Sequence, residues 1–252
     1  MNIDLSGMKV LVTGASGGIG KAIARGLALS GATVAIHFNR NAESAHELEK
    51  ELRHGAKAFK ADLGVPEECF RLFIEVLEHY EYIDVLVNNS GIIINSPLDA
   101  SAEQWLQDWN TTLSINLTAA GILSRAAVTH FMSRGGGRII NIASRAAFRG
   151  DTPEYLAYAA SKGGMVSMSR SIARAYGKNN IKSFVVAPGF VRTGMARQFI
   201  EQYGESIVVD DLALDRLTEP DDVAPTVVFL ASGLMDHATG CTIDINAGSY
   251  VR

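Results

Sequence analysis

A glycine-rich turn directly after a short apolar run is the feature that most restricts how this chain can fold. Residues Met8–Thr13 are apolar enough to form a buried strand. The segment Gly14–Gly20 follows with four glycines and leads into an amphipathic stretch, Lys21–Ser30. Such a turn presents backbone N–H groups at the positive end of a helix dipole, with no Cβ atoms in the way. The order of strand, turn and helix therefore predicts a phosphate-binding site, although the Gly-x3-Gly-x-Gly spacing differs from the general dinucleotide fingerprint.

Strand-like and helix-like segments alternate along the rest of the chain. The further predicted strands are Thr33–His37, Ala56–Lys60, Ile83–Asn88, Gly137–Ala143, Ile181–Ala187 and Thr242–Ile245. The further predicted helices are Ala42–His54, Pro66–Tyr80, Ala102–Ser133, Leu156–Tyr176 and Pro220–Ser232. This alternation predicts an α/β fold, a doubly wound (Rossmann-type) parallel sheet of about seven strands with helices on both faces.

The predicted sheet would collect the polar and glycine-rich segments at one edge. Ligands of doubly wound sheets bind beyond the carboxyl ends of the strands. Gly14, Asp62, Asn88, Ser144 and Pro188 each lie at or just after the end of a predicted strand. We expect residues 1–252 to form a single dinucleotide-binding and catalytic domain, in which the irregular stretch 190–218 covers the active site as a helical lid.

Three side chains near the middle of the chain suit proton transfer. Tyr158 and Lys162 are four residues apart and so share one helical face, and Ser144 lies upstream at the end of an apolar run. A nearby ammonium group stabilises a phenolate and lowers the tyrosine pKa from about 10 toward neutrality. A serine hydroxyl beside them can hold a carbonyl or alcohol oxygen.

Taken together, these motifs resemble those of the short-chain dehydrogenase/reductase family almost from end to end. The matching motifs are Thr13-Gly14-x3-Gly18-x-Gly20, Asn88-Asn89-Ser90-Gly91, Asn116 within Ser-Ile-Asn-Leu, Ser144, Tyr158-x3-Lys162 and Pro188-Gly189-Phe-Val-Arg-Thr193. The overall pattern is most similar to the 3-oxoacyl-(acyl-carrier-protein) reductases and to the sugar 1-dehydrogenases, such as glucose 1-dehydrogenase. The resemblance implies an NAD(P)-dependent enzyme acting on CH–OH or C=O groups.

The resemblance also implies a role for each matching residue. Tyr158 is the general acid or base, Ser144 orients the substrate oxygen, Lys162 lowers the tyrosine pKa, and Asn116 ties a water to Lys162. The residues expected to bind the cofactor are Gly14, Ser16, Gly18, Ile19, Gly20, Asn39, Arg40, Asp62, Leu63, Asn89, Gly91, Tyr158, Lys162, Pro188, Gly189, Val191 and Thr193. No metal site is expected.

The end of the second predicted strand bears on the choice of cofactor. NAD-dependent sites carry an acid there that binds the ribose hydroxyls and repels a 2′-phosphate. This chain has Phe38 at that position, followed by Asn39 and Arg40, whose guanidinium suits phosphate. NADP(H) is therefore favoured, and NAD(H) stays possible.

Several of these residues have a plainer interpretation. Asp62 could cap the helix that begins near Pro66 instead of contacting adenine, and Asn88, favoured as a cofactor-side residue, and Asn89 could satisfy strand-edge backbone groups. Arg145 and Arg149 could recognise an anionic substrate or an acidic carrier protein. We favour a pairing of these two arginines with Asp151 or Glu154.

Composition and charge limit the class of protein. A net charge of −4 argues against general nucleic-acid binding, and Cys69 and Cys241 are too isolated for a disulfide framework or a thiolate metal site. No apolar run reaches membrane-spanning length, so a cytoplasmic protein is expected. The helices 102–133 and 156–176 carry apolar residues on more than one side, which predicts a homotetramer.

The substrate is the least determined part of the prediction. We expect reduction of a ketone or 3-oxoacyl carbonyl, with oxidation of a secondary alcohol in the reverse direction. Oxidation of a sugar or polyol is an alternative, and a cofactor-sensing protein without turnover is a third interpretation. An acyl carrier protein could dock on basic residues at helix ends, which are Arg134, Arg138, Arg170, Arg174 and Lys178.

Overall fold

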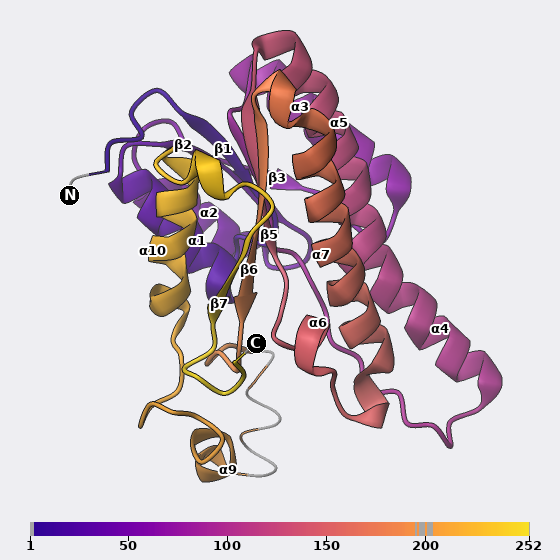
Figure 1. Ribbon diagram of the computed structural model, residues 1–252. Coiled ribbons are helices and arrows are strands. Elements are labelled where there is room, and N and C mark those ends of the chain that lie inside the picture. Colours follow the sequence, from indigo (N-terminus) through magenta and orange to yellow (C-terminus); the bar gives the residue numbers. More distant parts are fainter. Residues whose placement is uncertain (1–2, 195, 197–199, 201–203, 252) are drawn as a thin grey trace.

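A seven-stranded parallel sheet forms the centre of the protein, as the computed structural model shows (Figure 1). The structure describes residues 3–194, 196, 200 and 204–251. The strand order is β3-β2-β1-β4-β5-β6-β7, and every neighbouring pair is parallel. The strands are β1 (Lys9–Val12), β2 (Thr33–Phe38), β3 (Lys57–Lys60), β4 (Val85–Asn88), β5 (Gly137–Ile142), β6 (Ile181–Pro188) and β7 (Thr242–Ile245). The predicted doubly wound α/β fold is confirmed.

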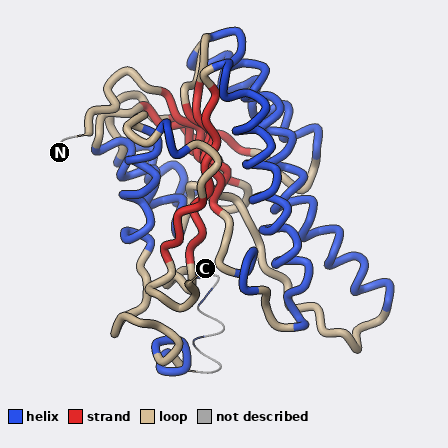
Figure 2. Tube along the Cα trace, in the orientation of Figure 1, coloured by secondary structure: helices blue, strands red, loops and turns tan. Residues whose placement is uncertain are grey.

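Helices cover both faces of the sheet (Figure 2). The helices are α1 (Gly18–Leu29), α2 (Ala42–Glu51), α3 (Pro66–Tyr80), α4 (Ala102–Leu113), α5 (Ala119–Arg134), α6 (Ala146–Arg149), α7 (Leu156–Tyr176), α9 (Glu205–Val209) and α10 (Pro220–Ala231). Helices α1, α2 and α10 lie on one side of the sheet, and α3, α4, α5 and α7 lie on the other (Figure 1). This arrangement makes a three-layer molecule.

Strand β1 shows why the sheet needs a helical layer on each face. Val10 and Val12 pack into the core under α1 and α10, whereas Leu11, between them, packs into the core under α3 and α5. Successive side chains of a strand point to opposite faces, so an uninterrupted apolar run is stable only where both faces are covered. The three side chains are at most 1% exposed.

The long helix predicted over Ala102–Ser133 is interrupted. Helix α4 ends at Leu113, a π-helical segment spans Ser114–Thr118, and α5 begins at Ala119. In the π-helical turn the N–H of Ala119 donates to the carbonyl oxygen of Ser114, five residues back. Single π-turns of this kind are frequent at functional sites. Asn116 is at the centre of this turn.

The carboxyl ends of the strands collect at the lower edge of the molecule in Figure 1, where α6 and α9 also lie. Residues 195, 197–199 and 201–203 of the predicted lid lie outside the described residues, so the lid stays a prediction. Its described part includes the short helix α9, for which a helical segment was expected. None of the helices in the described part of the chain is long and apolar enough to cross a membrane.

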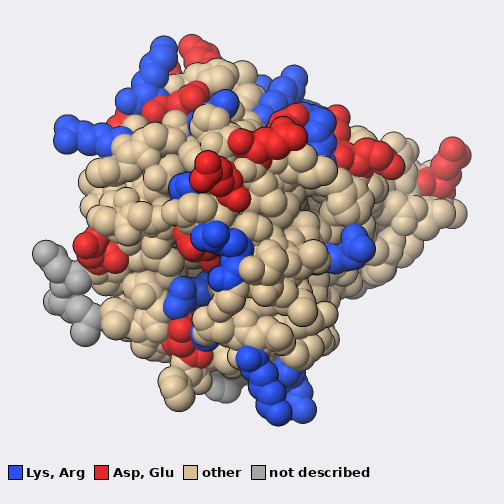
Figure 3. Space-filling view, turned by 90° about the horizontal axis from the view of Figure 1, so that it is seen from above, with Lys and Arg blue, Asp and Glu red and all other residues tan. Residues whose placement is uncertain are grey.

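Figure 3 looks onto the opposite edge, where the strands begin. Lysine and arginine side chains are interspersed there with aspartate and glutamate (Figure 3). Arg138, at the start of β5, forms a bidentate ion pair with Asp236. Nε donates to Oδ1 and Nη2 to Oδ2, each at 2.9 Å. The charged groups of this edge are thus partly paired with one another.

Candidate active site

The glycine turn between β1 and α1 has the geometry expected of an anion site. Gly14 and Gly18 have φ of +65° and +51°, a conformation that side chains with a Cβ rarely adopt. A Cβ at Gly20 would overlap the carbonyl oxygen of Gly14, so the helix can approach the strand only at a glycine. Helix α1 begins after Gly17 with no side-chain cap from the described residues and no acid in its first turn. Its first N–H groups therefore suit a phosphate.

Two polar side chains hold the start of this turn. Thr13 Oγ1 accepts hydrogen bonds from the N–H groups of Asn89 and Ser90, at 2.9 and 3.0 Å. Asn89 Nδ2 donates to the carbonyl oxygens of Thr13 and Gly14, at 2.8 and 3.3 Å. The backbone-satisfying interpretation of Asn89 is therefore the one that the structure shows. These hydrogen bonds join the end of β1 to the end of β4 and so hold the first glycine of the turn in position.

Phe38 stands at the end of β2, where an NAD-dependent enzyme would carry an acidic residue. The Phe38 side chain is 4% exposed and packs edge-on against His46 of α2, with 5.7 Å between ring centroids. Arg40 is exposed and makes no ion pair with any described residue. An unpaired guanidinium beside the turn can bind an added phosphate without first losing a protein partner. Asn39 lies between the two and is partly exposed.

Asp62 does not cap α3, so that alternative is wrong. The N-cap of α3 is Val65, with Pro66 as the first helical residue. Asp62 Oδ1 instead accepts a 2.9 Å hydrogen bond from the N–H of Gly64, and the N–H of Asp62 donates to Glu68 Oε2 at 2.6 Å. Leu63 is 5% exposed and packs into the core, so only its backbone can face a ligand.

Asn88 also differs from the expectation that it faces the cofactor. Its side chain is 2% exposed, and Nδ2 donates to Ser124 Oγ at 3.0 Å and to Asn141 Oδ1 at 2.9 Å. These partners belong to α5 and β5, so the amide points into the protein interior. Asn88 joins two elements of the scaffold through side-chain partners, so its amide does not satisfy strand-edge backbone groups either.

Ser144 and Tyr158 are two of the residues predicted to be catalytic, and they lie close enough for the serine to act on the tyrosine pKa. Ser144 follows β5, is 8% exposed, and its Oγ accepts a 3.1 Å hydrogen bond from the N–H of Ala146. Burial raises the pKa of Tyr158, and a hydrogen bond with Ser144 acts in the opposite direction. The net effect on the Tyr158 pKa is upward, and Lys162 Nζ is directed to the Ile142 carbonyl oxygen, so a lowering of this pKa by Lys162 stays a prediction.

Lys162 is buried, with 3% of its surface exposed, on the same face of α7 as Tyr158. Its Nζ donates a 2.9 Å hydrogen bond to the carbonyl oxygen of Ile142 and lies 5.8 Å from the centre of the Tyr158 ring. Burial lowers the pKa of Lys162 to about 8. A Cβ at Gly91 would lie 3.2 Å from Nζ, so this glycine leaves room for the lysine head group.

Asn116 is fully buried in the π-helical turn, and its side chain is bound to protein groups. Oδ1 accepts from the N–H of Ile92 at 2.8 Å, and Nδ2 donates to the carbonyl oxygen of Ile92 at 2.9 Å and to Ser161 Oγ at 3.1 Å. Both amide donors are thus occupied by protein atoms. Asn116 fastens the chain after β4 to α7, and a water link to Lys162 stays a prediction.

The Pro188–Thr193 segment closes the other side of the turn. Gly189 is needed there because a Cβ would lie 2.8 Å from the Cα of Asn246. Val191 pairs with Thr218 in an isolated bridge, and a Cβ at Gly18 would lie 3.3 Å from Thr193 Cγ2. The Pro188 carbonyl oxygen accepts from the N–H of Arg145, at 2.9 Å. The segment therefore borders both the glycine turn and the loop that carries Ser144.

Arg145 and Arg149 are paired, but with a different acid from the two expected. Nη1 of each arginine donates to Asp211 Oδ2, at 2.9 Å from Arg145 and 2.7 Å from Arg149. Asp211 follows α9, whose first residue, Glu205, pairs with Arg192. Ion pairs thus hold the chain at both ends of helix α9. Spacing in the sequence gave no signal for Asp211, which is more than 60 residues away.

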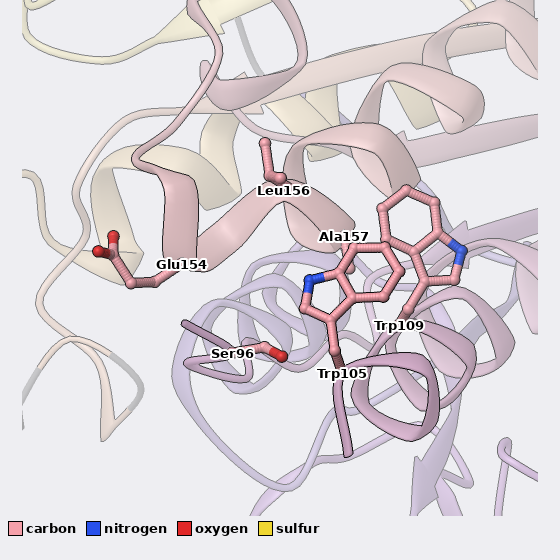
Figure 4. Close-up of a pocket in the computed structure, with 6 residues that line it drawn as sticks. All are labelled: Ser96, Trp105, Trp109, Glu154, Leu156 and Ala157. Carbon is pink, nitrogen blue, oxygen red and sulfur yellow. The ribbon is translucent and has the colours of Figure 1, made fainter. Parts of the chain in front are cut away.

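A small pocket lies between the start of α7 and helix α4 (Figure 4). Trp105 and Trp109 stack there, with 5.2 Å between ring centroids and 22° between ring planes. Its volume of about 10 Å³ suits one water molecule and is too small for a substrate. Among the described residues, no group of three or more His, Cys, Asp or Glu side chains is placed to hold a metal ion.

Comparison with known proteins agrees with this geometry. The family model for short chain dehydrogenases matches residues 8–204. The chain belongs to the short-chain dehydrogenase family. As a member of this family it is an NAD(P)-dependent oxidoreductase that acts on CH–OH or C=O groups, and the resemblance inferred from its motifs is confirmed.

Two curated relatives and one solved structure illustrate the range of the family. Nodulation protein G of Rhizobium sp. (strain N33) is 38% identical over 97% of this chain and 98% of its own length. The 3-oxoacyl-(acyl-carrier-protein) reductase FabG of Aquifex aeolicus is 32% identical over 99% of this chain and all (100%) of its own. A Beutenbergia cavernae structure assigned as an NAD(P)-dependent gluconate 5-dehydrogenase, with bound NADP at low occupancy, is 32% identical, with a TM-score of 0.91 over 99% of both chains.

Proposed function

We propose that this short-chain dehydrogenase is an NADP-dependent reductase of a ketone or 3-oxoacyl carbonyl, and that it oxidises the corresponding secondary alcohol in reverse. The observation that carries the proposal is the proximity of Ser144, which follows β5, to Tyr158 of α7, close enough for the serine to act on the pKa of the tyrosine. This pair can hold a carbonyl oxygen and supply a proton to it.

When bound, a nicotinamide cofactor would supply the hydride, and residues of the chain would control the proton. Tyr158 gives its hydroxyl proton to the substrate oxygen during reduction and takes it back during oxidation. Ser144 donates a hydrogen bond to the same oxygen while negative charge develops on it. Lys162, Pro188, Gly189, Val191 and Thr193 form the wall on which the nicotinamide end of the cofactor would rest.

The adenosine end favours NADP(H) over NAD(H). The phosphates fit the uncapped N-terminus of α1, and the Phe38 side chain is buried where an acid would repel a 2′-phosphate. Arg40 is exposed and able to pair with that phosphate. The Beutenbergia relative, which shares the fold over nearly its whole length, holds NADP.

Substrate choice rests on the relatives and on the charges at the entrance. The reductase relatives support a 3-oxoacyl thioester, and oxidation of a sugar acid is the second candidate because structural relatives from Beutenbergia cavernae and Agrobacterium tumefaciens are assigned as gluconate dehydrogenases. Arg145 and Arg149 face the lid beside Ser144, and either substrate carries groups that such cations could bind.

The positions of the basic residues within one chain give little support for docking of an acyl carrier protein. Arg134, Arg138 and Lys178 lie at ends of elements that point toward the opposite edge of the sheet from Ser144. They do not border this chain's own site. A carrier protein would have to use Arg145, Arg149 or Arg170, or to reach the site of a neighbouring subunit.

A homotetramer is part of the proposal. Ile115, Leu117 and Met168 are only partly buried on the helical layer formed by α4, α5 and α7. Another subunit could cover these residues, as is common for helices with apolar groups on more than one side. Light scattering of the purified protein tests this, and a stable monomer would contradict it.

The substrate proposal is tested by following NADPH absorbance with two substrates. Rapid NADPH oxidation with a 3-oxoacyl thioester and slow NADP⁺ reduction with gluconate are the expected results. The reverse order would replace the first substrate candidate by the second. No turnover with either substrate, or with a panel of simple ketones, would contradict the proposal.

A further inference from the structure

We propose that His37 is a positioning residue that joins the phosphate-binding turn to the adenosine side of the cofactor site. The proposal rests on the cofactor binding described above. His37 was not among the residues that the sequence motifs singled out. It lies in β2, one residue before Phe38, and is 2% exposed.

The imidazole of His37 makes one hydrogen bond to each half of the site. The N–H of Gly14, the first glycine of the turn, donates to His37 Nδ1 at 2.9 Å. On the other side of the ring, Nε2 lies 3.1 Å from the carbonyl oxygen of Ala61. Ala61 directly precedes Asp62 and Leu63, which were predicted to contact the adenosine. A single ring thus connects the end of β1 with the end of β3.

These contacts allow only one form of the ring. Nδ1 accepts a hydrogen bond and therefore carries no proton, so Nε2 must carry the proton and donate it to Ala61. A protonated ring would carry a hydrogen on both nitrogens. The N–H of Gly14 would then face a second N–H at Nδ1 and lose its acceptor. Burial lowers the pKa of His37 to about 4, which keeps the ring in this neutral form near pH 7.

The backbone of His37 continues the same pattern. Its carbonyl oxygen accepts from the N–H of Ala15 at 2.9 Å, and the N–H of Thr13 donates to the carbonyl oxygen of Val87 at 3.0 Å. The first three N–H groups of the segment, those of Thr13, Gly14 and Ala15, are therefore all directed at protein acceptors. The N–H groups that follow, at the start of α1, are left for the phosphates. His37 supplies two of these three acceptors, so it sets where the anion site begins.

A histidine that only filled space in the core would leave the cofactor unaffected. Phe38, the next residue, is such a space-filling group, with its ring against His46. His37 differs because both ring nitrogens are within hydrogen-bond distance of backbone atoms in cofactor-binding segments. Removing those bonds leaves a buried N–H and a buried carbonyl group without partners, which costs more than the bonds themselves contribute.

Two variants and one control separate positioning from packing. His37→Phe keeps the ring volume and removes both hydrogen bonds. His37→Asn restores an acceptor, Oδ1, close to where Nδ1 lies. Val34→Ala is the control, because Val34 is a fully buried residue near the other end of the same strand, where it pairs with Val10 of β1. Titration with NADP⁺ and with 2′,5′-ADP, together with urea unfolding, is measured for all four proteins.

We expect His37→Phe to weaken NADP⁺ and 2′,5′-ADP binding roughly tenfold, and His37→Asn to weaken them less. The kcat at saturating NADPH should change less than twofold while KM for NADPH rises, because Ser144 and Tyr158 are not in contact with His37. Val34→Ala should lower stability and leave both affinities within about twofold of wild type. Unchanged affinity in His37→Phe, or an equal loss of affinity in Val34→Ala, would overturn the proposal.

Nitrogen NMR of the wild-type protein keeps the proposal testable if His37→Phe does not fold. The His37 ring, assigned as the signal missing from His37→Asn, should show a protonated Nε2 and an unprotonated Nδ1 at pH 7, with and without NADP⁺. A protonated Nδ1, or rapid averaging of the two forms, would overturn the proposal. If the wild-type protein binds no NADP⁺ at all, the proposed function fails, whereas binding that is insensitive to His37 refutes only this inference.

Discussion

Lys162 donates its 2.9 Å hydrogen bond to the carbonyl oxygen of Ile142 and not to the hydroxyl group of Tyr158. The lysine therefore ties α7 to the last residue of β5, two residues before Ser144. This places the serine and the tyrosine on elements that are held together at the site itself. Ser144, by contrast, acts to lower the pKa of Tyr158, against the larger effect of burial.

Replacing Ser144 by Ala should raise the pKa of Tyr158 further, because the hydrogen bond from Ser144 lowers it. Alcohol oxidation needs the ionised tyrosine, so its rate profile should shift to higher pH. The kcat should also fall by about 10²- to 10³-fold, since a donor to the developing charge is lost. The pH dependence of kcat for alcohol oxidation checks this, and a profile unchanged in position would count against the role of Ser144.

Replacing Arg40 by Ala should weaken NADPH binding by at least roughly tenfold, because a charge-assisted pair with the 2′-phosphate is lost. NADH has no such phosphate and should bind as before. Isothermal titration of both cofactors measures the two affinities. Arg174→Ala is a suitable control, since Arg174 is an exposed arginine in the last turn of α7, toward the edge of the sheet where the strands begin. Equal losses of affinity for NADPH and NADH would show that Arg40 does not bind the 2′-phosphate.

Replacing Gly20 by Ala should destabilise the protein and weaken both cofactors, because the new Cβ overlaps the carbonyl oxygen of Gly14 and Asn89 Nδ2. The turn would have to open, and the anion site would move with it. Gly177→Ala is the matched control: no atom lies within 4 Å of its Cβ position, and its φ is −55°. Thermal unfolding should show a lower midpoint for Gly20→Ala and an unchanged or higher one for Gly177→Ala.

Acidification should weaken the fold through His37. Its pKa is lowered from 6.5 to about 4 in the folded chain, so the unfolded chain binds the proton more readily between these values. The free energy of unfolding should therefore fall as the pH drops from about 6.5 to about 4, by up to about 3 kcal/mol from this group. Asp62, the charged group acting on the ring, only partly offsets the effect of burial.

Urea unfolding of wild type and His37→Asn at pH 7 and pH 4.5 isolates this contribution. The variant lacks the titrating group, so the stability difference between the two proteins should narrow at the lower pH. A difference that stays constant would show that His37 does not titrate abnormally. Carboxylates such as Asp222, whose pKa is lowered to about 2 by Arg216, affect both proteins equally.

The strands and the order of the helices could be predicted from the sequence, because they depend on local periodicity. The shared helical face of Tyr158 and Lys162 could also be predicted, because the two residues are four positions apart, and their catalytic role stays a prediction. The π-turn at Asn116 could not, since the apolar pattern of residues 102–133 is compatible with one continuous helix. The hydrogen bonds of His37 and the pairing of Asp211 join segments that are distant in the chain. The pKa of Tyr158 depends on burial, which the sequence does not show.

The most direct test of the account compares NADPH oxidation by the wild-type protein and by Tyr158→Phe, with a carbonyl substrate that the wild type reduces. The phenyl ring keeps the packing and removes only the proton donor. The account predicts a rate about 10²- to 10⁴-fold lower for the variant, with NADPH affinity within a few-fold of wild type by titration. A variant that binds NADPH and reduces the substrate at the wild-type rate would contradict the account.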